Sequence, residues 1–421
     1  MLSLSKREGR AITLERTCSR HHHETTAPCL FGAGHVIFVR AGKQRLMAAA
    51  KGQPPLVFAA LQHNIERTAM WRKLVAFMRF GDAVRPSLPL APATPLTEVS
   101  FAPNPGNLRM FQYLPPGMGV GAPLVVILHG CGQTAAGYDL GAGWSRLADQ
   151  LGFAVLAAEQ KAVNNPNSCF DWFNPEDIAR GEGEAASIAR MIQTMVETHR
   201  LDVARIFITG LSAGGAMSAV MLAAYPEMFA GGAIIGGLAF GSAQNVRDAL
   251  ESMRSAPLRA PAQWGAAVRA ASGHRGPWPK ISIWHGALDA VVNINNAQAG
   301  VAQWADLHGF SLMDATQEMV EGAIRLRWDD TLEVYTLPAM GHGTPIDSRD
   351  LGQPGPFILE AGISSTRRIA EFWGLTAVLR PQPAATLPKI EAALLHRSEP
   401  AGQDAENLIM RALRAVGLIK R

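Results

Sequence analysis

Thr209-Gly210-Leu211-Ser212-Ala213-Gly214-Gly215 follows the apolar run Arg205 to Ile208 and leads into a helix-like stretch, Ala216 to Tyr225. A G-x-S-x-G pattern between a strand and a helix is typical of a nucleophile elbow, a sharp turn that exposes a reactive serine. The glycines permit the strained backbone and the close packing that this turn needs. The sequence therefore predicts Ser212 as a nucleophile above a helix N-terminus, whose partial positive charge favours a developing oxyanion.

A serine nucleophile needs a base to take its proton and an acid to orient that base. In α/β-hydrolases these residues come in the order Ser, Asp, His, each on a loop after a strand. Asp289 follows the predicted strand Ile281 to His285, and His342 follows the predicted strand Leu332 to Thr336. Both positions fit this order, so Ser212, Asp289 and His342 are the predicted catalytic residues.

The oxyanion hole is predicted on the loop His129-Gly130-Cys131-Gly132-Gln133, which follows the apolar run Leu124 to Leu128. In this fold an early strand carries a loop whose backbone N–H faces the tetrahedral oxygen. The N–H groups of Cys131 and Ala213 are the predicted donors. Two histidines at strand ends are interpreted as structural rather than catalytic: His129 and His285.

Strands and helices alternate from about residue 96 to 376, which predicts a doubly wound, mostly parallel sheet. Apolar residues between Ile188 and Val196 recur at helical spacing. Residues 245–278 interrupt the rhythm with short helices and prolines, and are the candidate for a short helical cap. The predicted strands are Leu108–Leu114 at the edge of the sheet, Leu124–Leu128, Phe153–Ala158, Arg205–Thr209, Gly232–Ile235, Ile281–His285 and Leu332–Thr336.

The chain of 421 residues divides into three parts by composition and by its pattern of strands and helices. Residues 1–95 are a basic extension that ends in a proline-rich linker, and residues 96–376 form the catalytic domain. Residues 377–421 are a tail with a predicted terminal helix, Asp404 to Arg421. Residues 1–90 carry 14 Lys and Arg against 5 Asp and Glu, whereas the remainder is mildly acidic. The front end is interpreted as a solvated arm.

Several classes of protein are disfavoured. There is no dense basic run and no nucleic-acid reader motif, and no apolar stretch reaches the ~18–20 residues of a membrane span. No secretory signal is visible, so a cytoplasmic location is favoured, with an extracellular or periplasmic one as the alternative. The sequence predicts no metal and no cofactor, and it does not fix the oligomeric state. The one Cys/His-rich segment fits no standard zinc spacing: Cys18, His21, His22, His23 and Cys29.

Several motifs together resemble the polyhydroxybutyrate (PHB) depolymerase family of esterases, over roughly Leu108 to Trp373. They are His129-Gly130-Cys131-Gly132-Gln133-Thr134, Cys169-Phe170-Asp171-Trp172-Phe173, Gly210-Leu211-Ser212-Ala213-Gly214-Gly215, Trp284-His285-Gly286 leading to Asp289, and Gly341-His342-Gly343. The resemblance implies an α/β-hydrolase that opens carboxylic esters through an acyl-enzyme. It favours poly- or oligo-3-hydroxybutyrate as the substrate, small or polymeric.

The resemblance also implies that Cys131 and Cys169 form a disulfide, which would need an oxidising compartment. Two buried free thiols are the alternative. Trp172 and Gln133 are the predicted substrate contacts. An apolar trough for the acyl chain could further include Trp144, Phe173, Trp278 and Trp284, although tryptophans more often serve as packing residues.

Two other functions stay open. The same branch of the superfamily includes feruloyl and acetylxylan esterases, which act on plant polysaccharide esters. A catalytically silent binding module on a hydrolase scaffold is the second alternative. It is disfavoured because the serine, the aspartate and the histidine are all present in the expected order.

Overall fold

The computed structural model describes residues 37–41, 44–48 and 94–375. The predicted N-terminal arm and C-terminal tail fall largely outside these residues. Contacts between Cα atoms divide the chain between Pro86 and Ser87. In the first unit, β1 (Ile37–Ala41) and β2 (Gln44–Ala48) form an antiparallel pair. All the other described elements belong to the second unit.

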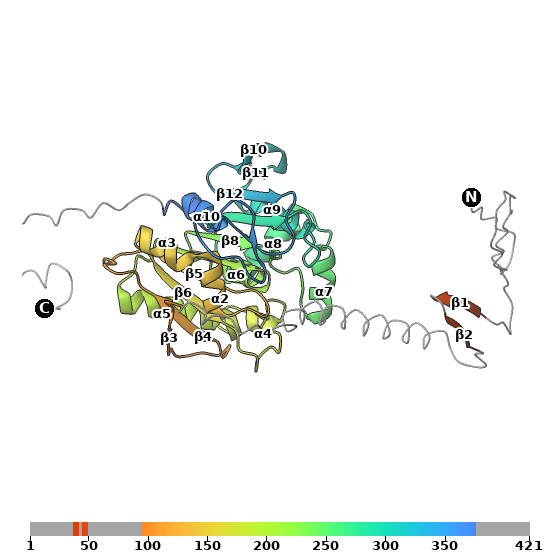
Figure 1. Ribbon diagram of the computed structural model, residues 1–421, viewed down its shortest axis with the longest axis horizontal. Coiled ribbons are helices and arrows are strands. Elements are labelled where there is room, and N and C mark those ends of the chain that lie inside the picture. The colour runs from red at the N-terminus through yellow and green to blue at the C-terminus, as the bar shows by residue number, and fades with distance from the viewer. Residues whose placement is uncertain (1–36, 42–43, 49–93, 376–421) are drawn as a thin grey trace, which may run out of the picture. The chain divides into compact units, whose positions relative to one another are not determined.

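A ten-stranded sheet forms the centre of the second unit, in the order β10-β11-β12-β9-β8-β7-β5-β6-β4-β3 (Figure 1). The six central strands, from β12 to β6, are parallel, and the two outer strands on each side are antiparallel. The strands are β3 (Thr97–Val99), β4 (Arg109–Tyr113), β5 (Leu124–Leu128), β6 (Ala154–Glu159), β7 (Ile206–Leu211), β8 (Gly231–Ile235), β9 (Lys280–Gly286), β10 (Thr316–Val320), β11 (Ala323–Trp328) and β12 (Leu332–Leu337).

The prediction of a mostly parallel sheet is confirmed, and the predicted central strands match the observed ones within two residues at either end. Every residue of β5, β6, β7 and β8 is buried, as expected for parallel strands covered on both faces. The prediction that the strand near Leu108 is an edge strand is wrong, because β3 pairs with β4 and takes the edge position. Three strands of this sheet have no predicted counterpart: β3, β10 and β11.

Helices cover both faces of the sheet, as Figure 1 shows. Helices α5, α6, α8 and α9 contribute to one apolar core and α2, α3 and α10 to the other. The helices are α2 (Ala135–Ala142), α3 (Trp144–Leu151), α4 (Pro175–Ile178), α5 (Gly183–His199), α6 (Ala213–Ala224), α7 (Val246–Arg254), α8 (Pro261–Ser272), α9 (Asn295–His308) and α10 (Ser365–Trp373), with 3-10 turns η1 (Pro226–Met228) and η2 (Leu312–Asp314) and a small parallel pair, β13 (Thr344–Ile346) and β14 (Ile358–Glu360).

The predicted cap segment, residues 245–278, contains α7 and α8. Helix α8 packs against α9 and α6, next to the sheet. Helix α7 is tied to the loop that follows β9 and to the start of α9. The N–H of Asn293 in the loop donates to the carbonyl oxygen of Met253, and Nδ2 of Asn296 in α9 donates to the carbonyl oxygen of Ser252. This segment therefore supports the loop that carries Asp289. Whether it acts as a cap remains a prediction.

Candidate active site

Ser212 occupies the single residue between β7 and α6. Its backbone has φ 57° and ψ −116°. A positive φ of this kind costs about 1–3 kcal/mol in a residue other than glycine. The surrounding backbone holds it there, because its N–H donates to the carbonyl oxygen of Ile235 at 2.8 Å and its own carbonyl accepts from Ala216 at 2.9 Å. The strained turn is the one that the G-x-S-x-G pattern predicts.

Two glycines let this turn pack against the neighbouring strand. A Cβ atom on Gly210 would lie 2.7 Å from the carbonyl oxygen of Leu128, and one on Gly214 would overlap that oxygen and the carbonyl of His129. Real Cβ atoms do not approach backbone so closely. The elbow therefore sits directly against the start of the loop that carries Cys131.

Asp289 and His342 are in contact although 53 residues separate them in the chain. Nδ1 of His342 lies 2.7 Å from Oδ2 of Asp289, and both side chains are almost fully buried. Asp289 follows β9 and His342 follows β12, its direct neighbour in the sheet. Parallel neighbours end at the same edge, which brings the two loops together.

The carboxylate of Asp289 is surrounded by donors. Its Oδ1 accepts the backbone N–H groups of Val291 and Val292, each at 2.8 Å. Its Oδ2 faces His342 and also Nε2 of His285, at 3.3 Å. Burial by itself would raise the pKa of Asp289, but hydrogen bonds from His285 and His342 and the positive charge that His342 can carry outweigh it. The pKa therefore lies well below the usual range, and the carboxylate stays charged.

The imidazole of His342 lies beside the elbow. A Cβ atom on Gly236 would be 3.2 Å from Cε1 and 3.3 Å from Nδ1 of this ring, and Gly236 follows Ile235, the residue that accepts the N–H of Ser212. Phe357 covers the ring edge-on, with centroids 5.8 Å apart. Ser212 Oγ makes no hydrogen bond to a residue in 94–375 in this conformation. Such contacts often tighten only when substrate binds.

A buried histidine holds the start of the loop after β5. His129, 1% exposed, has Nδ1 2.8 Å from the carbonyl oxygen of Gly130, and its Nε2 accepts the N–H of Gln160 at 3.1 Å. Burial lowers the pKa of His129, so the ring is neutral. These contacts fit the interpretation of His129 as a loop-fixing residue.

The second predicted oxyanion donor lies at the start of a helix. Ala213 is the first residue of α6, where backbone N–H groups have no acceptor within the helix.

Cys131 and Cys169 form a disulfide in the structure, with their Cα atoms 4.3 Å apart. The bridge ties the loop after β5 to the segment before Trp172. The N–H of Gly132 adds a second tie to this segment, donating to the carbonyl oxygen of Asn167 at 2.8 Å. The loop of the predicted oxyanion donor is thereby fixed on both sides.

The predicted substrate contacts are placed unevenly. Trp172 is 8% exposed and packs edge-on against Phe173, so it offers little surface to a substrate. The amide of Gln133 is already hydrogen-bonded to the backbone: its Oε1 accepts the N–H of Gly130, and its Nε2 donates to the carbonyl oxygen of Pro356. Trp144 and Trp284 are fully buried. The prediction that these last two tryptophans line a trough is wrong, because they pack between the sheet and its neighbours.

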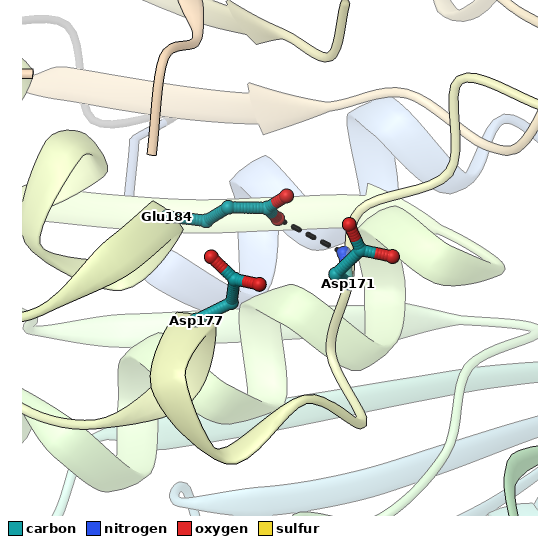
Figure 2. Close-up of side chains that lie close together, drawn as sticks. All are labelled: Asp171, Asp177 and Glu184. Atoms are coloured by element: carbon teal, nitrogen blue, oxygen red, sulfur yellow. Dashed lines mark hydrogen bonds between the residues drawn. The ribbon is translucent and has the colours of Figure 1, made fainter. Parts of the chain in front are cut away.

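One group of acidic side chains lies near the segment of Cys169. Within the described residues, Asp171, Asp177 and Glu184 bring carboxylate oxygens within 4.8 Å of one another. Figure 2 shows the three side chains close together. Neutral donors occupy these oxygens: the N–H of Asp171 donates to Glu184 at 3.0 Å, Asn165 donates to Asp171, and Asn174 to Asp177. Burial raises the pKa of Glu184 well above its usual value. The negative charge of Asp171 acts in the same direction as burial.

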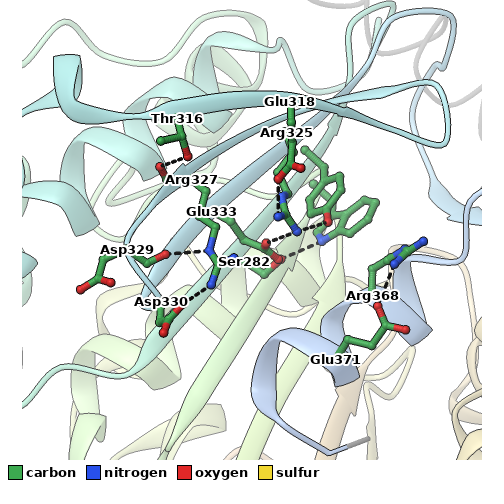
Figure 3. A network of polar contacts seen from close by, with 12 residues as sticks. Ser282, Thr316, Glu318, Arg325, Arg327, Asp329, Asp330, Glu333, Arg368 and Glu371 are labelled. Carbon is green, nitrogen blue, oxygen red and sulfur yellow. Dashed lines mark hydrogen bonds and ion pairs between the residues drawn. The ribbon is translucent and has the colours of Figure 1, made fainter.

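A polar network covers the sheet face between β9, β11, β12 and α10 (Figure 3). Glu333, 1% exposed, accepts a 2.7 Å hydrogen bond from the hydroxyl of Ser282, and Trp284 donates to the same hydroxyl. Nη1 of Arg325 donates to the Tyr335 hydroxyl at 3.1 Å. Burial raises the pKa of Glu333 to about 7, against the effect of Ser282 and Arg325.

No helix in residues 37–41, 44–48 or 94–375 combines the length and apolarity needed to cross a membrane.

Comparison with known proteins identifies relatives. Residues 108–327 match the family model described as Esterase PHB depolymerase. Poly(3-hydroxyalkanoate) depolymerase C of Paucimonas lemoignei is 42% identical over 291 residues, which cover 66% of this chain and 70% of that protein. An acetylxylan esterase of Coprinopsis cinerea is 32% identical over 276 residues, covering 62% of this chain and 73% of that one.

Among solved structures, an acetyl xylan esterase from Aspergillus awamori superposes with a TM-score of 0.58, covering 66% of this chain and 99% of that one. Its identity of 24% makes it evidence for the fold alone. The order of the central strands, the elbow after β7, the family match and the similarity to a depolymerase agree. The chain belongs to the PHB depolymerase family of esterases and is a serine carboxylic ester hydrolase with the α/β-hydrolase fold.

Proposed function

We propose that the enzyme hydrolyses poly- or oligo-3-hydroxyalkanoate esters of short chain length, with Ser212 as nucleophile, His342 as base and Asp289 as the orienting acid. The observation that carries the proposal is the contact of His342 with Asp289 beside a serine on a strained elbow. The 42% identity to a poly(3-hydroxyalkanoate) depolymerase supports the substrate class.

The geometry suggests the following sequence of steps. His342 takes the proton of Ser212 Oγ while the oxygen attacks the ester carbonyl, and the N–H groups of Cys131 and Ala213 stabilise the oxyanion. The alcohol leaves with the proton from His342. A water molecule, deprotonated by the same imidazole, then hydrolyses the acyl-enzyme. Asp289 remains ionised throughout, since its four donors favour the charged form.

An acetylxylan or feruloyl esterase is the second candidate, because a 32% identical relative is named an acetylxylan esterase. A panel of 3-hydroxybutyrate oligomers, acetylated xylan, methyl ferulate and p-nitrophenyl esters separates the two. We expect the highest kcat/KM on the hydroxybutyrate oligomers. A preference for ferulate or acetylated xylan would overturn the proposed substrate while leaving the catalytic residues in place.

Ser212→Ala is the control for the whole panel. Removal of the nucleophile is expected to lower turnover by several orders of magnitude and to abolish labelling by a fluorophosphonate probe. Labelling that persists in the variant would assign the nucleophile to another residue. A wild-type enzyme that is folded but never labelled would favour the silent binding module.

The disulfide bears on where the enzyme acts. A bridge between Cys131 and Cys169 supports an oxidising compartment, which is the extracellular or periplasmic alternative rather than the cytoplasm. Fractionation of the producing cells tests this proposal, and recovery of active enzyme from the cytoplasm alone would refute it.

A further inference from the structure

Two imidazole rings face the same oxygen of Asp289. Nδ1 of His342 lies 2.7 Å from Oδ2, and Nε2 of His285 lies 3.3 Å from it. His285 belongs to β9 and precedes Asp289 by four residues, so the strand and the loop after it supply both the carboxylate and this second ring. The two rings contact one oxygen, whereas backbone N–H groups occupy the other.

The hydrogen on His285 can be assigned from its surroundings. Nε2 faces two acceptors, the carbonyl oxygen of Val292 at 2.8 Å and Oδ2 of Asp289. Two acceptors require that Nε2 carries the hydrogen. Nδ1 is buried and has no partner among the described residues.

The unpaired Nδ1 argues against a purely space-filling role. The ring is 1% exposed, and leaving a buried polar atom without a partner destabilises the fold. A methionine would fill a similar volume without that penalty. The benefit of a histidine must then come from Nε2, which donates to the carbonyl oxygen of Val292 and lies 3.3 Å from the carboxylate.

We infer that His285 is a positioning residue for the reaction, which donates a second N–H to Asp289 and thereby sets how strongly this carboxylate holds the imidazolium form of His342. The inference rests on the proposed roles of Asp289 and His342. A carboxylate that shares one oxygen between two donors attracts each of them less strongly than it would attract one alone. His285 thus keeps His342 available as a free base at lower pH.

Few titratable groups lie near Asp289, so this effect can be measured. Within 4 Å of its carboxylate, His285 from β9 and His342 from the loop after β12 are the titratable groups among residues 94–375. The other contacts come from the backbone N–H groups of the loop that leads to α9. A change at His285 therefore reaches His342 through one oxygen, without a third ionisable partner.

The experiment compares two substitutions of His285. His285→Met removes the N–H, whereas His285→Gln retains a donor at nearly the same distance from the backbone. For each variant, kcat/KM on p-nitrophenyl acetate and the rate of fluorophosphonate labelling are measured against pH. We expect His285→Met to move the acid limb of both profiles upward by roughly half to one pH unit, with kcat lowered more than KM is raised. His285→Gln is expected to keep the wild-type limb.

His308 provides a matched control. Its Nε2 lies 3.1 Å from the carbonyl oxygen of Pro279, a contact of the same kind as that of His285 with Val292 but far from Asp289 in the chain. His308→Met is expected to lower the melting temperature and leave the acid limb unchanged. A structural role for His285 alone would produce that same pattern in His285→Met, and would overturn the inference.

Two further results are decisive. If His285→Met does not fold, His285→Asn replaces it, because its donor is one bond too short to reach Oδ2; an acid limb equal to that of His285→Gln would refute the inference. Failure of the proposed function looks different, because the wild-type enzyme would then not be labelled at Ser212. In that case the proton resonance of His342 Nδ1–H, followed by NMR against pH, still reports the coupling. His285→Gln is expected to match the wild type, and a titration of His285→Asn identical to that of the wild type would refute the inference.

Discussion

The side-chain amide of Gln133 donates a hydrogen bond of 2.9 Å to the carbonyl oxygen of Pro356, 223 residues further along the chain. Its Oε1 accepts the N–H of Gly130, also at 2.9 Å. Pro356 is followed by Phe357, which covers the ring of His342. One side chain therefore joins the loop of the predicted oxyanion donor to the loop beside the predicted base.

Substitution of Gln133 tests whether it braces these loops or contacts the substrate. Gln133→Glu keeps an acceptor for Gly130 but loses the donor to Pro356, and Gln133→Ala loses both. If the residue is a brace, both variants lower kcat by roughly 10- to 100-fold. The factor is then the same for p-nitrophenyl acetate, p-nitrophenyl butyrate and a hydroxybutyrate dimer. A loss confined to one acyl group would instead support the substrate contact predicted from the sequence.

The elbow predicts a steep penalty for one added methyl group. Gly214→Ala would drive its Cβ into the carbonyl groups of Leu128 and His129, and the backbone there cannot move without displacing β5. We expect a loss of about 1–3 kcal/mol in the free energy of unfolding together with a large fall in kcat. Gly119→Ala is the control, because a Cβ there meets nothing within 4 Å. Equal stabilities of the two variants would contradict the packing argument.

The disulfide predicts a chemical result and an energetic one. Alkylation without reductant should modify at most two of the four cysteines in the chain, and Cys131 and Cys169 should remain unmodified until a reductant is added. The double variant Cys131→Ser, Cys169→Ser is expected to lose ~2–4 kcal/mol of stability. Turnover should fall as well, because the loop after β5 loses a tie. Full alkylation of both cysteines in the native enzyme would refute the bridge.

The buried carboxyl of Glu333 predicts that stability depends on pH. Its pKa is about 7 in the fold against 4.5 for an ordinary glutamate, so the folded state retains the proton that the unfolded chain releases. The favourable contribution is complete below about pH 4.5 and is lost as the pH rises through 7.

Glu333→Gln keeps an acceptor for Ser282 and cannot lose a proton. We therefore expect the free energy of unfolding of the variant, measured with denaturant, to rise relative to that of the wild type by a few kcal/mol between pH 5 and pH 8. Glu197→Gln, at a site that is 66% exposed, is the control and should show no gain of this kind over the same interval. A difference between Glu333→Gln and the wild type that stays constant with pH would show that Glu333 is ionised in the fold.

The central part of the fold could be predicted because its signals are local. The run Leu124 to Leu128 is apolar at every position and forms β5 with the same bounds, and the glycines of the elbow fix the turn at Ser212. The sequences of β10 and β11 have no such signal. Most of β10 is exposed, and its residues become a strand only because β11 presents unpaired backbone beside them.

Some contacts of the site depend on the folded chain and had no signal in the sequence. His285 could be recognised as buried, but its approach to Asp289 depends on how the loop from Gly286 to Val292 turns back. The bridge from Gln133 to Pro356 connects segments whose separation along the chain gives no hint of proximity. The burial of Trp144 and Trp284 likewise follows from packing, on Trp373 and Tyr335 respectively.

The strand order around Ser212 has a consequence for how the enzyme could change its substrates. The strands β5 and β7 are neighbours, yet the helices that follow them, α2 and α6, pack on opposite faces of the sheet. The chain diverges at this point, and in open α/β sheets ligands bind outside the carboxyl ends of strands at such a switch point. Ser212, the predicted nucleophile, and the loop of Cys131 follow these two strands. New ester specificities could therefore arise by replacing the loops around these strand ends while the chemistry stays where the topology places it.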